Sequence, residues 1–224
     1  MKLKQLVLFA MSASLVFGAN DAVKRLQESA TTISEIMGAS DKSIPQDLLD
    51  KAECVVIVPG LKKGAFIIGG KFGRGFVTCS KEEAGWSSPA AMRVEGGSFG
   101  FQIGGSETDV IMLVMNKSGM DKLFTSKFTL GADASVAAGP VGRTSSAETD
   151  ALMRAEILTY SRSRGIFAGI ALNGATLRPD DDTNRDLYGS ALTTKEIVAG
   201  NTPPPAAASV LLADLNKYSS RKSK

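Results

Sequence analysis

The sequence predicts a single α+β domain: Gly-rich, largely antiparallel β-structure with an N-terminal amphipathic helix and short peripheral helices. Helical spacing of apolar residues is clearest near the two ends of the chain. Between them, short apolar runs are punctuated by many of the chain's 23 glycines, as in strands joined by turns. The 224 residues are 43% hydrophobic and 22% charged, which is typical of a globular domain that buries its own core.

The first 18 residues are predicted to be a secretory signal peptide. A basic start, MKLKQ, precedes the apolar run LVLFAMSASLVFG, which is shorter than the roughly 20 residues that a membrane-spanning helix needs. We expect cleavage after Gly18 and a soluble, exported protein, periplasmic or secreted, that is peripheral to a membrane. No cysteine follows the run, so a lipid anchor is not expected. The alternative is that these residues form a first core helix.

The charge of the mature chain is close to neutral. Removal of residues 1–18 leaves 24 basic and 23 acidic side chains, a formal charge of +1. Long-range attraction to nucleic acid is therefore weak, and we expect no nucleic-acid partner. The chain contains no histidine.

Residues 21–38 predict an amphipathic helix, because its apolar residues recur at spacings of three and four. The apolar face comprises Val23, Leu26, Ala30, Ile33 and Met37. A shorter helix is expected to begin at Pro45. The β-structure that follows is predicted in the segments CVVIVP, GAFIIGGKFGRGFVTC, AAMRVEGGSFGFQIGG and DVIMLVMN.

The second half of the chain mixes strands with short helices. SGMDKLFTSK predicts a helix capped by Ser118 and Asp121, and Thr193 with Glu196 forms a capping box for a helix in TTKEIVAG. LRPDDDTNRDLYG predicts a turn and another short helix, whereas SSAETDALMRAE is ambiguous. The run ILTYSRSRGIFAGIAL predicts a strand after a turn at SRSRG, with one face formed by Ile166, Ala168, Ile170 and Leu172. Residues 19–200 form the predicted domain, and residues 201–224 a Pro-rich linker, a helix over 206–218 with Leu211, Leu215 and Tyr218 on one face, and a basic tail.

The two cysteines leave two alternatives open. Cys54 and Cys79 each lie in an apolar, β-like run, which favours a pair of buried free thiols. Export to an oxidising compartment would instead permit a disulfide. A metal site is not expected, because no other ligands accompany them.

Three motifs that resemble catalytic or ligand-binding signatures are incomplete. GGSFG at 96–100 matches a nucleophile elbow around Ser98, but a chain without histidine cannot build the usual triad. GAFIIGGKFG departs from a phosphate loop, since Phe72 replaces the hydroxyl residue that would hold magnesium. DDDTNRD lacks the Gly and Glu of a calcium loop, so its acids are expected to form a hydrogen-bonded turn before a helix. We therefore expect no catalytic residues, cofactor or metal.

Basic residues recur at the glycine turns. Because backbone amides and cations can face one phosphate together, these residues are candidate ligands for anionic head groups. They are Lys62, Lys63, Lys71, Arg74, Arg143, Arg162 and Arg164. The alternative is that they are ordinary solvated charges.

The segment LGADASVAAGPVGR at 130–143 consists mostly of small residues. It is expected to allow close packing of neighbouring strands, with backbone freedom at Gly131, Gly139 and Gly142. Asp133 is expected to be satisfied by backbone amides or an arginine. Arg143 remains a candidate ligand of an anionic head group.

Several long blocks in order resemble the SYLF domain family, also called the Ysc84-type actin-binding domain. They include VVIVPGLKKGAFIIGGKFGRG, GGSFGFQIGGSETDVIMLVMN, SKFTLGADASVAAGPVGR and YSRSRGIFAGIALNGATLRPD, and the likeness covers roughly residues 20–200. The resemblance implies a non-enzymatic module that binds anionic lipids, in particular phosphoinositides, with help from an N-terminal amphipathic helix. It also implies an exported, bacterial-type member. Actin, a partner of some eukaryotic relatives, is not expected for an exported protein.

Two functional hypotheses follow. In the first, residues 21–37 lie on a bilayer with Lys24 and Arg25 at the head groups and Val23, Leu26, Ile33 and Met37 on the membrane-contacting face, while the basic turns hold phosphate. In the second, the helix belongs to the core and the protein is a structural or protein-interaction module of the cell envelope.

Overall fold

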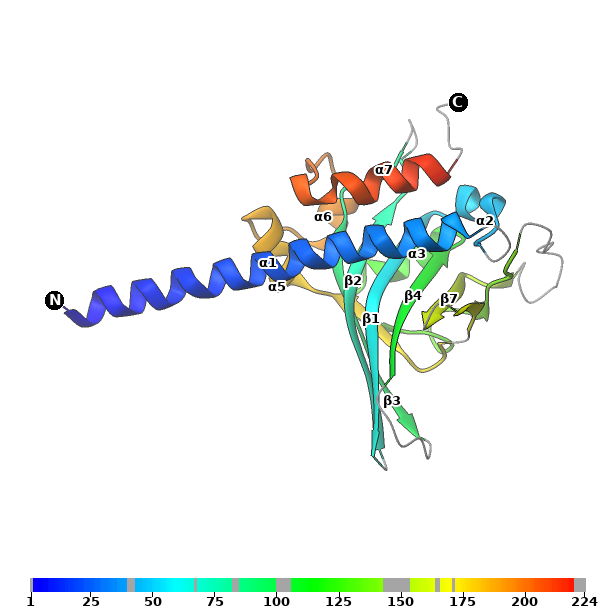
Figure 1. Ribbon diagram of the computed structural model, residues 1–224, viewed down its shortest axis with the longest axis horizontal. Coiled ribbons are helices and arrows are strands. Elements are labelled where there is room, and N and C mark those ends of the chain that lie inside the picture. Colours follow the sequence, from blue (N-terminus) through cyan, green and yellow to red (C-terminus); the bar gives the residue numbers. More distant parts are fainter. Residues whose placement is uncertain are drawn as a thin grey trace.

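Within the residues that the computed structural model describes, a nine-stranded sheet runs in the order β5-β9-β3-β2-β1-β4-β7-β6, with β8 paired to β7 (Figure 1). The structure describes residues 2–39, 43–66, 68–81, 85–99, 106–142, 154–163, 166–170 and 172–219, with side chains from residue 20 on except at 63–69, 97–99 and 106. All strand pairs are antiparallel except β6 with β7. The predicted α+β class with largely antiparallel strands is confirmed.

The long strands arise from the apolar, Gly-punctuated stretches. The strands are β1 (Cys54–Phe66), β2 (Ile68–Cys79), β3 (Ala90–Phe99), β4 (Ser106–Val114), β5 (Phe128–Thr129), β6 (Val136–Ala138), β7 (Ile157–Ser163), β8 (Ile166–Gly169) and β9 (Thr176–Pro179). The distal parts of β1, β2 and β3 extend well beyond the helices (Figure 1).

The helices are α1 (Lys2–Gly38), α2 (Gln46–Lys51), α3 (Lys117–Leu123), α5 (Asp181–Tyr188), α6 (Thr194–Ala199) and α7 (Ser209–Tyr218), with a 3₁₀ turn, η1 (Ala206–Ala208), before α7. α1 is one continuous helix that begins at Lys2 rather than at the predicted residue 21. Across the described residues, none of the helices is both long and apolar enough to cross a membrane. The signal peptide over residues 1–18 stays a prediction.

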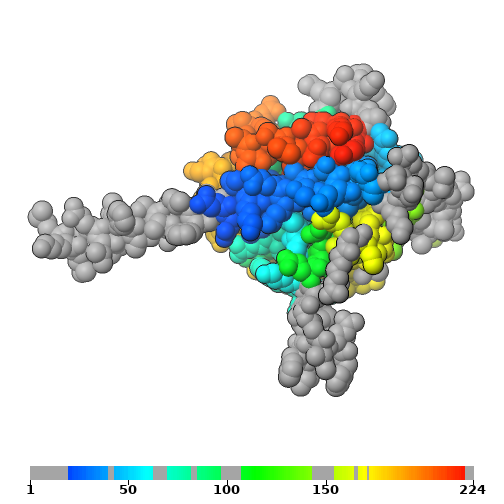
Figure 2. Space-filling view, in the orientation of Figure 1, coloured from blue at the N-terminus to red at the C-terminus, as the bar shows by residue number. Residues whose placement is uncertain are grey.

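Alternation along the central strands divides the buried residues between two faces of the sheet. Val55 and Ile57 of β1 point to the helix-side core, which also contains Leu26 and Ile33 of α1 and Leu211 of α7. The far core lies on the opposite face and includes Val56, Val58, Val77, Met92, Met112, Leu123, Leu177 and Ile197. α1 packs along α7 over the helix-side core (Figures 1 and 2).

Local capping signals predicted two of the short helices well. Thr193 and Glu196 form the expected capping box at the start of α6. Asp180 caps α5, accepting a hydrogen bond from the Thr183 amide, so the acids of DDDTNRD lead into a helix as predicted. The predicted caps of α3 were wrong. Asn116 accepts from the Gly119 amide at 2.9 Å, because its side chain lies one residue before the first helical turn.

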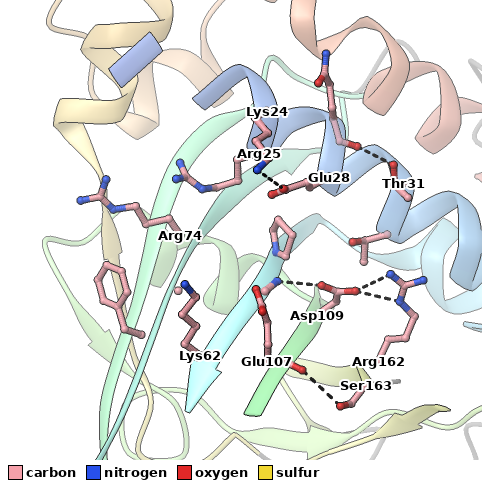
Figure 3. Close-up of a pocket in the computed structure, with 16 residues that line it drawn as sticks. Lys24, Arg25, Glu28, Thr31, Lys62, Arg74, Glu107, Asp109, Arg162 and Ser163 are labelled. Atoms are coloured by element: carbon pink, nitrogen blue, oxygen red, sulfur yellow. Dashed lines mark hydrogen bonds and ion pairs between the residues drawn. The ribbon is translucent and has the colours of Figure 1, made fainter. Parts of the chain in front are cut away.

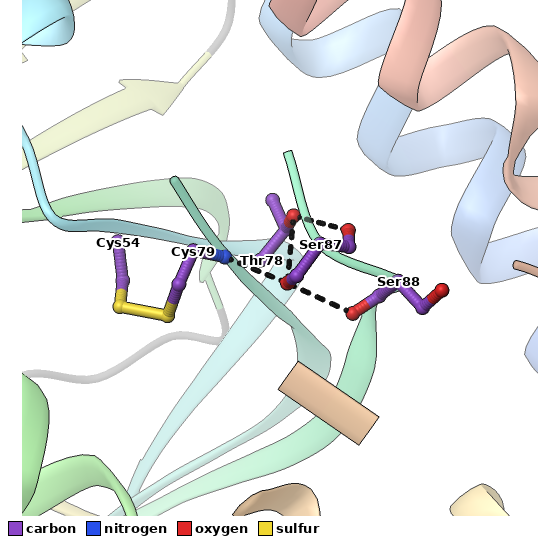
Figure 4. Close-up of a disulfide and its surroundings, with 5 residues drawn as sticks. All are labelled: Cys54, Thr78, Cys79, Ser87 and Ser88. Atoms are coloured by element: carbon purple, nitrogen blue, oxygen red, sulfur yellow. Dashed lines mark hydrogen bonds between the residues drawn. A yellow bond between two sulfur atoms is a disulfide. The ribbon is translucent and has the colours of Figure 1, made fainter. Parts of the chain in front are cut away.

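Cys54 and Cys79 form a disulfide (Figure 4), so the free-thiol alternative was wrong. The two residues pair directly across β1 and β2, which brings their side chains to the same face of the sheet. Next to the disulfide, Ser87 accepts from the Cys79 amide at 3.0 Å and anchors the chain that leads into β3.

The small-residue segment is structural, as expected. A Cβ on Gly139 would overlap the Tyr160 ring, and one on Gly169 would overlap the Gly139 backbone. These glycines let β6 and β8 pack against β7 without side chains between them. Asp133 accepts from the Thr129 amide at 2.6 Å, which confirms its backbone partner.

Glu156 connects the small-residue segment to α3. Its carboxylate accepts hydrogen bonds from Lys122 at 2.8 Å, from the Ser118 hydroxyl and from the Ser135 amide at 2.9 Å. Burial opposes ionisation of Glu156, but these bonds outweigh it and lower its pKa to about 2.

The face predicted for 166–172 was wrong. Phe167 points into the helix-side core and stacks on Tyr160, with ring centroids 5.5 Å apart. Its neighbours Ile166, 69% exposed, and Ala168 therefore face solvent, whereas Leu172 is buried beyond the end of β8.

Candidate functional site

A groove of about 980 Å³ is lined by α1 and by strands β1, β2, β4 and β7 (Figure 3). Its α1 wall runs from Lys24 to Thr32, and its floor includes Pro59 and Gly60 of β1 and Phe72 and Gly73 of β2. Leu26 and Ile33 of the same helix are fully buried in the helix-side core. One helix thus serves the core with one face and the groove with another.

The end of the groove nearest β2 is cationic. Lys24 and Arg25 approach from α1, Lys62 from β1 and Arg74 from β2 (Figure 3). Lys24 is 74% exposed and its partner, Glu28, lies 3.7 Å away on the same helix, an arrangement that stabilises little. Burial, and then the charge of Arg74, lower the pKa of Arg25. Cations from three elements therefore gather at one end of the groove, where Glu28 is a neighbouring acid on the α1 wall.

Arg74 is held by an acid from outside the groove. Its Nε lies 3.3 Å from Oδ2 of Asp180, whose Oδ1 lies 3.5 Å from Nη2 of Arg93. Asp180 is 1% exposed, so one buried carboxylate faces two guanidinium groups. Phe72, 49% exposed, lies beside Arg74 with its ring centroid 5.9 Å from the guanidinium carbon. The rim thus combines a cation with an exposed aromatic ring.

The opposite end of the groove is a closed ion-pair network. Arg162 donates to Asp109 at 2.7 and 3.0 Å and also pairs with Glu35 of α1. The Gly60 amide donates to Asp109 at 2.9 Å. Burial raises the pKa of Asp109, while the Gly60 hydrogen bond opposes the rise and Glu107 adds to it. This network ties α1 to β1, β4 and β7, and Arg162 already has two carboxylate partners.

A positive φ of 60° at Gly60 supports this network. This backbone angle is one that residues with a Cβ rarely adopt, so the position favours glycine. Gly60 therefore presents its amide to Asp109 at the point where the register of β1 shifts.

The structure brings together only part of the predicted ligand set. Lys62 and Arg74 line the groove, while Arg162 lies in the ion-pair network. Lys63 pairs with Lys71 across β1 and β2, but the Lys63 side chain is outside the described part of the chain. Arg143 and Arg164 also lie outside the described residues.

The α1 residues that were predicted to contact a membrane lie on different faces of the helix. Lys24 and Arg25 face the groove, Val23 and Met37 are half-buried, and Leu26 and Ile33 lie in the helix-side core. A role for these residues in membrane contact stays a prediction.

Sequence reasoning missed Arg93 and Asp180 as neighbours of the groove. Asp180 was expected only to cap a helix, and nothing in its sequence context points to β2. The partnership depends on strand register, which places Arg93 opposite Arg74. Of the other sequence motifs, Ser98 lies within β3, opposite Gly69, and not at a strand-to-helix turn.

Comparison with known proteins shows that the chain is similar to members of the Ysc84 family. The sequence pattern described as Ysc84, Las17-binding protein actin regulator, matches residues 95–218. An SH3 domain-containing protein of Schizosaccharomyces pombe is 35% identical over 81% of this chain and 43% of its own length. LAS seventeen-binding protein 3 of Saccharomyces cerevisiae is 34% identical over 78% of this chain and 38% of its own. The human SH3 domain-containing YSC84-like protein 1 is 32% identical over 91% and 59%. The chain thus spans about half the length of these relatives.

Proposed function

This chain belongs to the Ysc84 family of Las17-binding actin regulators, and from that premise we propose that it is a non-catalytic module that binds the head groups of anionic phospholipids. The observation that carries the proposal is the convergence of Lys24, Arg25, Lys62 and Arg74 on one end of the groove. Cations and a neighbouring exposed aromatic ring suit the boundary between head groups and acyl chains.

The proposal places α1 at the head groups with its apolar face still in the core. Leu26 and Ile33 are each fully buried, and transfer of such a side chain out of the core costs about 1.5–3 kcal/mol. Contact through the groove leaves both residues where they are. We therefore assign membrane contact to the polar edge of the helix, not to its apolar face.

The test is co-sedimentation with vesicles of phosphatidic acid or cardiolipin in phosphatidylcholine, at low and high salt. Replacement of two exposed cations by Lys24→Gln and Lys62→Gln is expected to lower the affinity about thirtyfold, since each lysine near an anionic surface contributes about 1 kcal/mol. The matched control is Lys51→Gln with Lys195→Gln, which removes the same charge from exposed sites on α2 and α6. Equal loss in both double variants, or equal binding of the wild-type protein to neutral vesicles, would contradict a role for the groove.

We also propose that the protein is exported. The basic and apolar start of the chain and the disulfide between Cys54 and Cys79 support this location, because disulfides persist in oxidising compartments. Cell fractionation with an antibody against the domain tests it. Recovery from the cytosol with both thiols free would be incompatible with export.

Actin is a second candidate partner, favoured by the family description. Co-sedimentation with actin filaments tests it on the same samples. Binding to filaments but not to anionic vesicles would replace the lipid proposal with this one.

A further inference from the structure

The disulfide between Cys54 and Cys79 is closed off from solvent (Figure 4). Cys54 is 0% and Cys79 3% exposed, and both belong to the far core. The end of β1 is also hydrogen-bonded on both sides. The Glu53 amide donates to the Val114 carbonyl at 2.7 Å, and the Ser80 amide donates to the Glu53 carbonyl at 2.8 Å. Strand pairing and the far core together therefore leave neither cysteine accessible.

Burial of both cysteines restricts their chemistry. Thiol–disulfide exchange requires a thiolate to reach a disulfide sulfur and passes through a mixed disulfide, so its rate depends on access. Buried structural cysteines are inert for this reason, whereas reactive cysteines lie in partly exposed surroundings. In the folded domain, an external oxidant thus has no room to form a mixed disulfide with either residue.

Much of the far core comes from segments that follow the two cysteines in the chain. These segments contribute Met112 and Val114 of β4, Leu123 of α3, Ile157 of β7 and Ile197 of α6. The β1–β2 hairpin alone places Cys54 opposite Cys79, at a sequence separation of 25. Hairpins form within microseconds, while pairing of distant segments is slower because longer loops must close. The two cysteines can therefore meet before the rest of the far core is in place.

We propose that Cys54 and Cys79 are the substrate of a disulfide-bearing oxidant that acts before the far core closes, and that the folded dithiol is no longer a substrate. The bond is thus made on a partly folded chain and then sealed. This order fits the proposed export, because oxidising compartments are where disulfides form. It is independent of lipid binding, so failure of either proposal leaves the other standing.

The reaction is a two-electron oxidation by disulfide exchange. One cysteine thiolate attacks the oxidant's disulfide, which forms a mixed disulfide and releases one oxidant thiolate. The other cysteine thiolate then attacks the cysteine sulfur of the mixed disulfide, which closes the Cys54–Cys79 bond and releases the second oxidant thiolate. The chain loses two electrons and two protons, and the oxidant gains them as two thiols.

The experiment changes the order in which oxidant and folding conditions are applied to the full chain. Protein reduced in urea receives oxidised glutathione either before or after the urea is diluted, and bond formation is followed by mass spectrometry of alkylated samples. Oxidation after dilution is expected to be at least about a hundredfold slower, because only transiently opened molecules react. Equal rates in the two orders, with the diluted dithiol shown by circular dichroism to be folded, would overturn the proposal.

The matched control is Lys195→Cys with the native disulfide left intact. Lys195 is an exposed residue of α6, so the new thiol is expected to react with oxidised glutathione at rates within about threefold in dilute buffer and in urea. A hundredfold loss in this control too would show that slow oxidation comes from the dilution and not from burial, which would overturn the proposal.

Reduction of the native protein gives a second measurement that does not require the dithiol to fold. Dithiothreitol is expected to reduce the Cys54–Cys79 bond at least about a hundredfold more slowly in buffer than in urea. Reduction in buffer within about tenfold of the rate in urea would show that the bond is accessible in the folded domain, and the proposal would be wrong. A dithiol that stays unfolded after dilution would support it, since the bond must then precede the fold.

Discussion

Replacement of Leu26 by Ala decides whether the apolar face of α1 serves the core or a membrane. Leu26 is fully buried in the helix-side core, so the truncation leaves a cavity under α1. Such substitutions cost about 2–5 kcal/mol, and we expect about 3 kcal/mol. That is a large part of the roughly 5–15 kcal/mol by which domains are stable.

The assay is urea unfolding followed by circular dichroism, with the disulfide kept oxidised. With a slope of about 2 kcal/mol per molar urea, the midpoint is expected to fall by about 1.5 M. Gln27→Ala is the control, because Gln27 is the exposed neighbour of Leu26 on the same helix. Its midpoint should stay within about 0.25 M of the wild-type value.

An unchanged midpoint for Leu26→Ala, together with weaker vesicle binding, would refute the core assignment. The apolar face of α1 would then act at the bilayer, as the first sequence hypothesis held. Removal of residues 19–38 gives an independent check, since a core helix cannot be deleted without unfolding the domain.

The remaining predictions concern stability. Replacing both Cys54 and Cys79 by Ala opens a loop with a sequence separation of 25 and should cost about 3.5 kcal/mol, measured as a lower urea midpoint; a cost below about 1 kcal/mol would argue against the disulfide as a stabilising link. Glu156→Gln should cost about 2 kcal/mol at pH 7. Because the folded pKa of about 2 lies below the unfolded value of 4.5, this cost should disappear as the pH falls from about 5 to 2, and a constant cost would exclude charge as its cause. Tyr160→Phe should leave the stability unchanged or raise it by up to about 1 kcal/mol, because the hydroxyl is buried with no hydrogen-bond partner among the described residues; a clear loss in calorimetry would reveal a partner.

The parts of the fold that depend on nearby residues could be predicted from the sequence. The apolar face of α1 follows from helical periodicity, and the capping box at Thr193 and Glu196 from a spacing of three residues. The face of β8 could not be predicted from alternation alone. Either Ile166 or its neighbour Phe167 could face the core. Phe167 does so because its ring stacks on Tyr160 of the neighbouring strand β7.

The site depends on register between strands that are distant in sequence. Lys62 and Arg74 were selected because glycines lie near them, but the predicted turns were wrong, since Lys62 lies within β1 and Arg74 within β2. Their approach to Lys24 requires the position of α1 over the sheet. Arg178 comes next to Arg93 only because β9 pairs with β3, two strands that are far apart in the sequence. The same holds for Cys54 and Cys79, whose pairing follows from the register of β1 and β2.

Because of the position of α1, binding of a head group in the groove and insertion of the apolar face of the helix into a bilayer exclude each other. Its apolar face holds Leu26 and Ile33 in the core, while Lys24 and Arg25 form the groove wall opposite Arg74. Ligand bound between these walls stabilises the docked helix, by about 2.7 kcal/mol at a hundredfold excess over the dissociation constant. Insertion of the apolar face into a bilayer would need the helix to leave the sheet, which would separate the cations of α1 from those of β1 and β2. A head group held in the groove therefore opposes insertion of the helix, and the two modes cannot contribute to the same bound state.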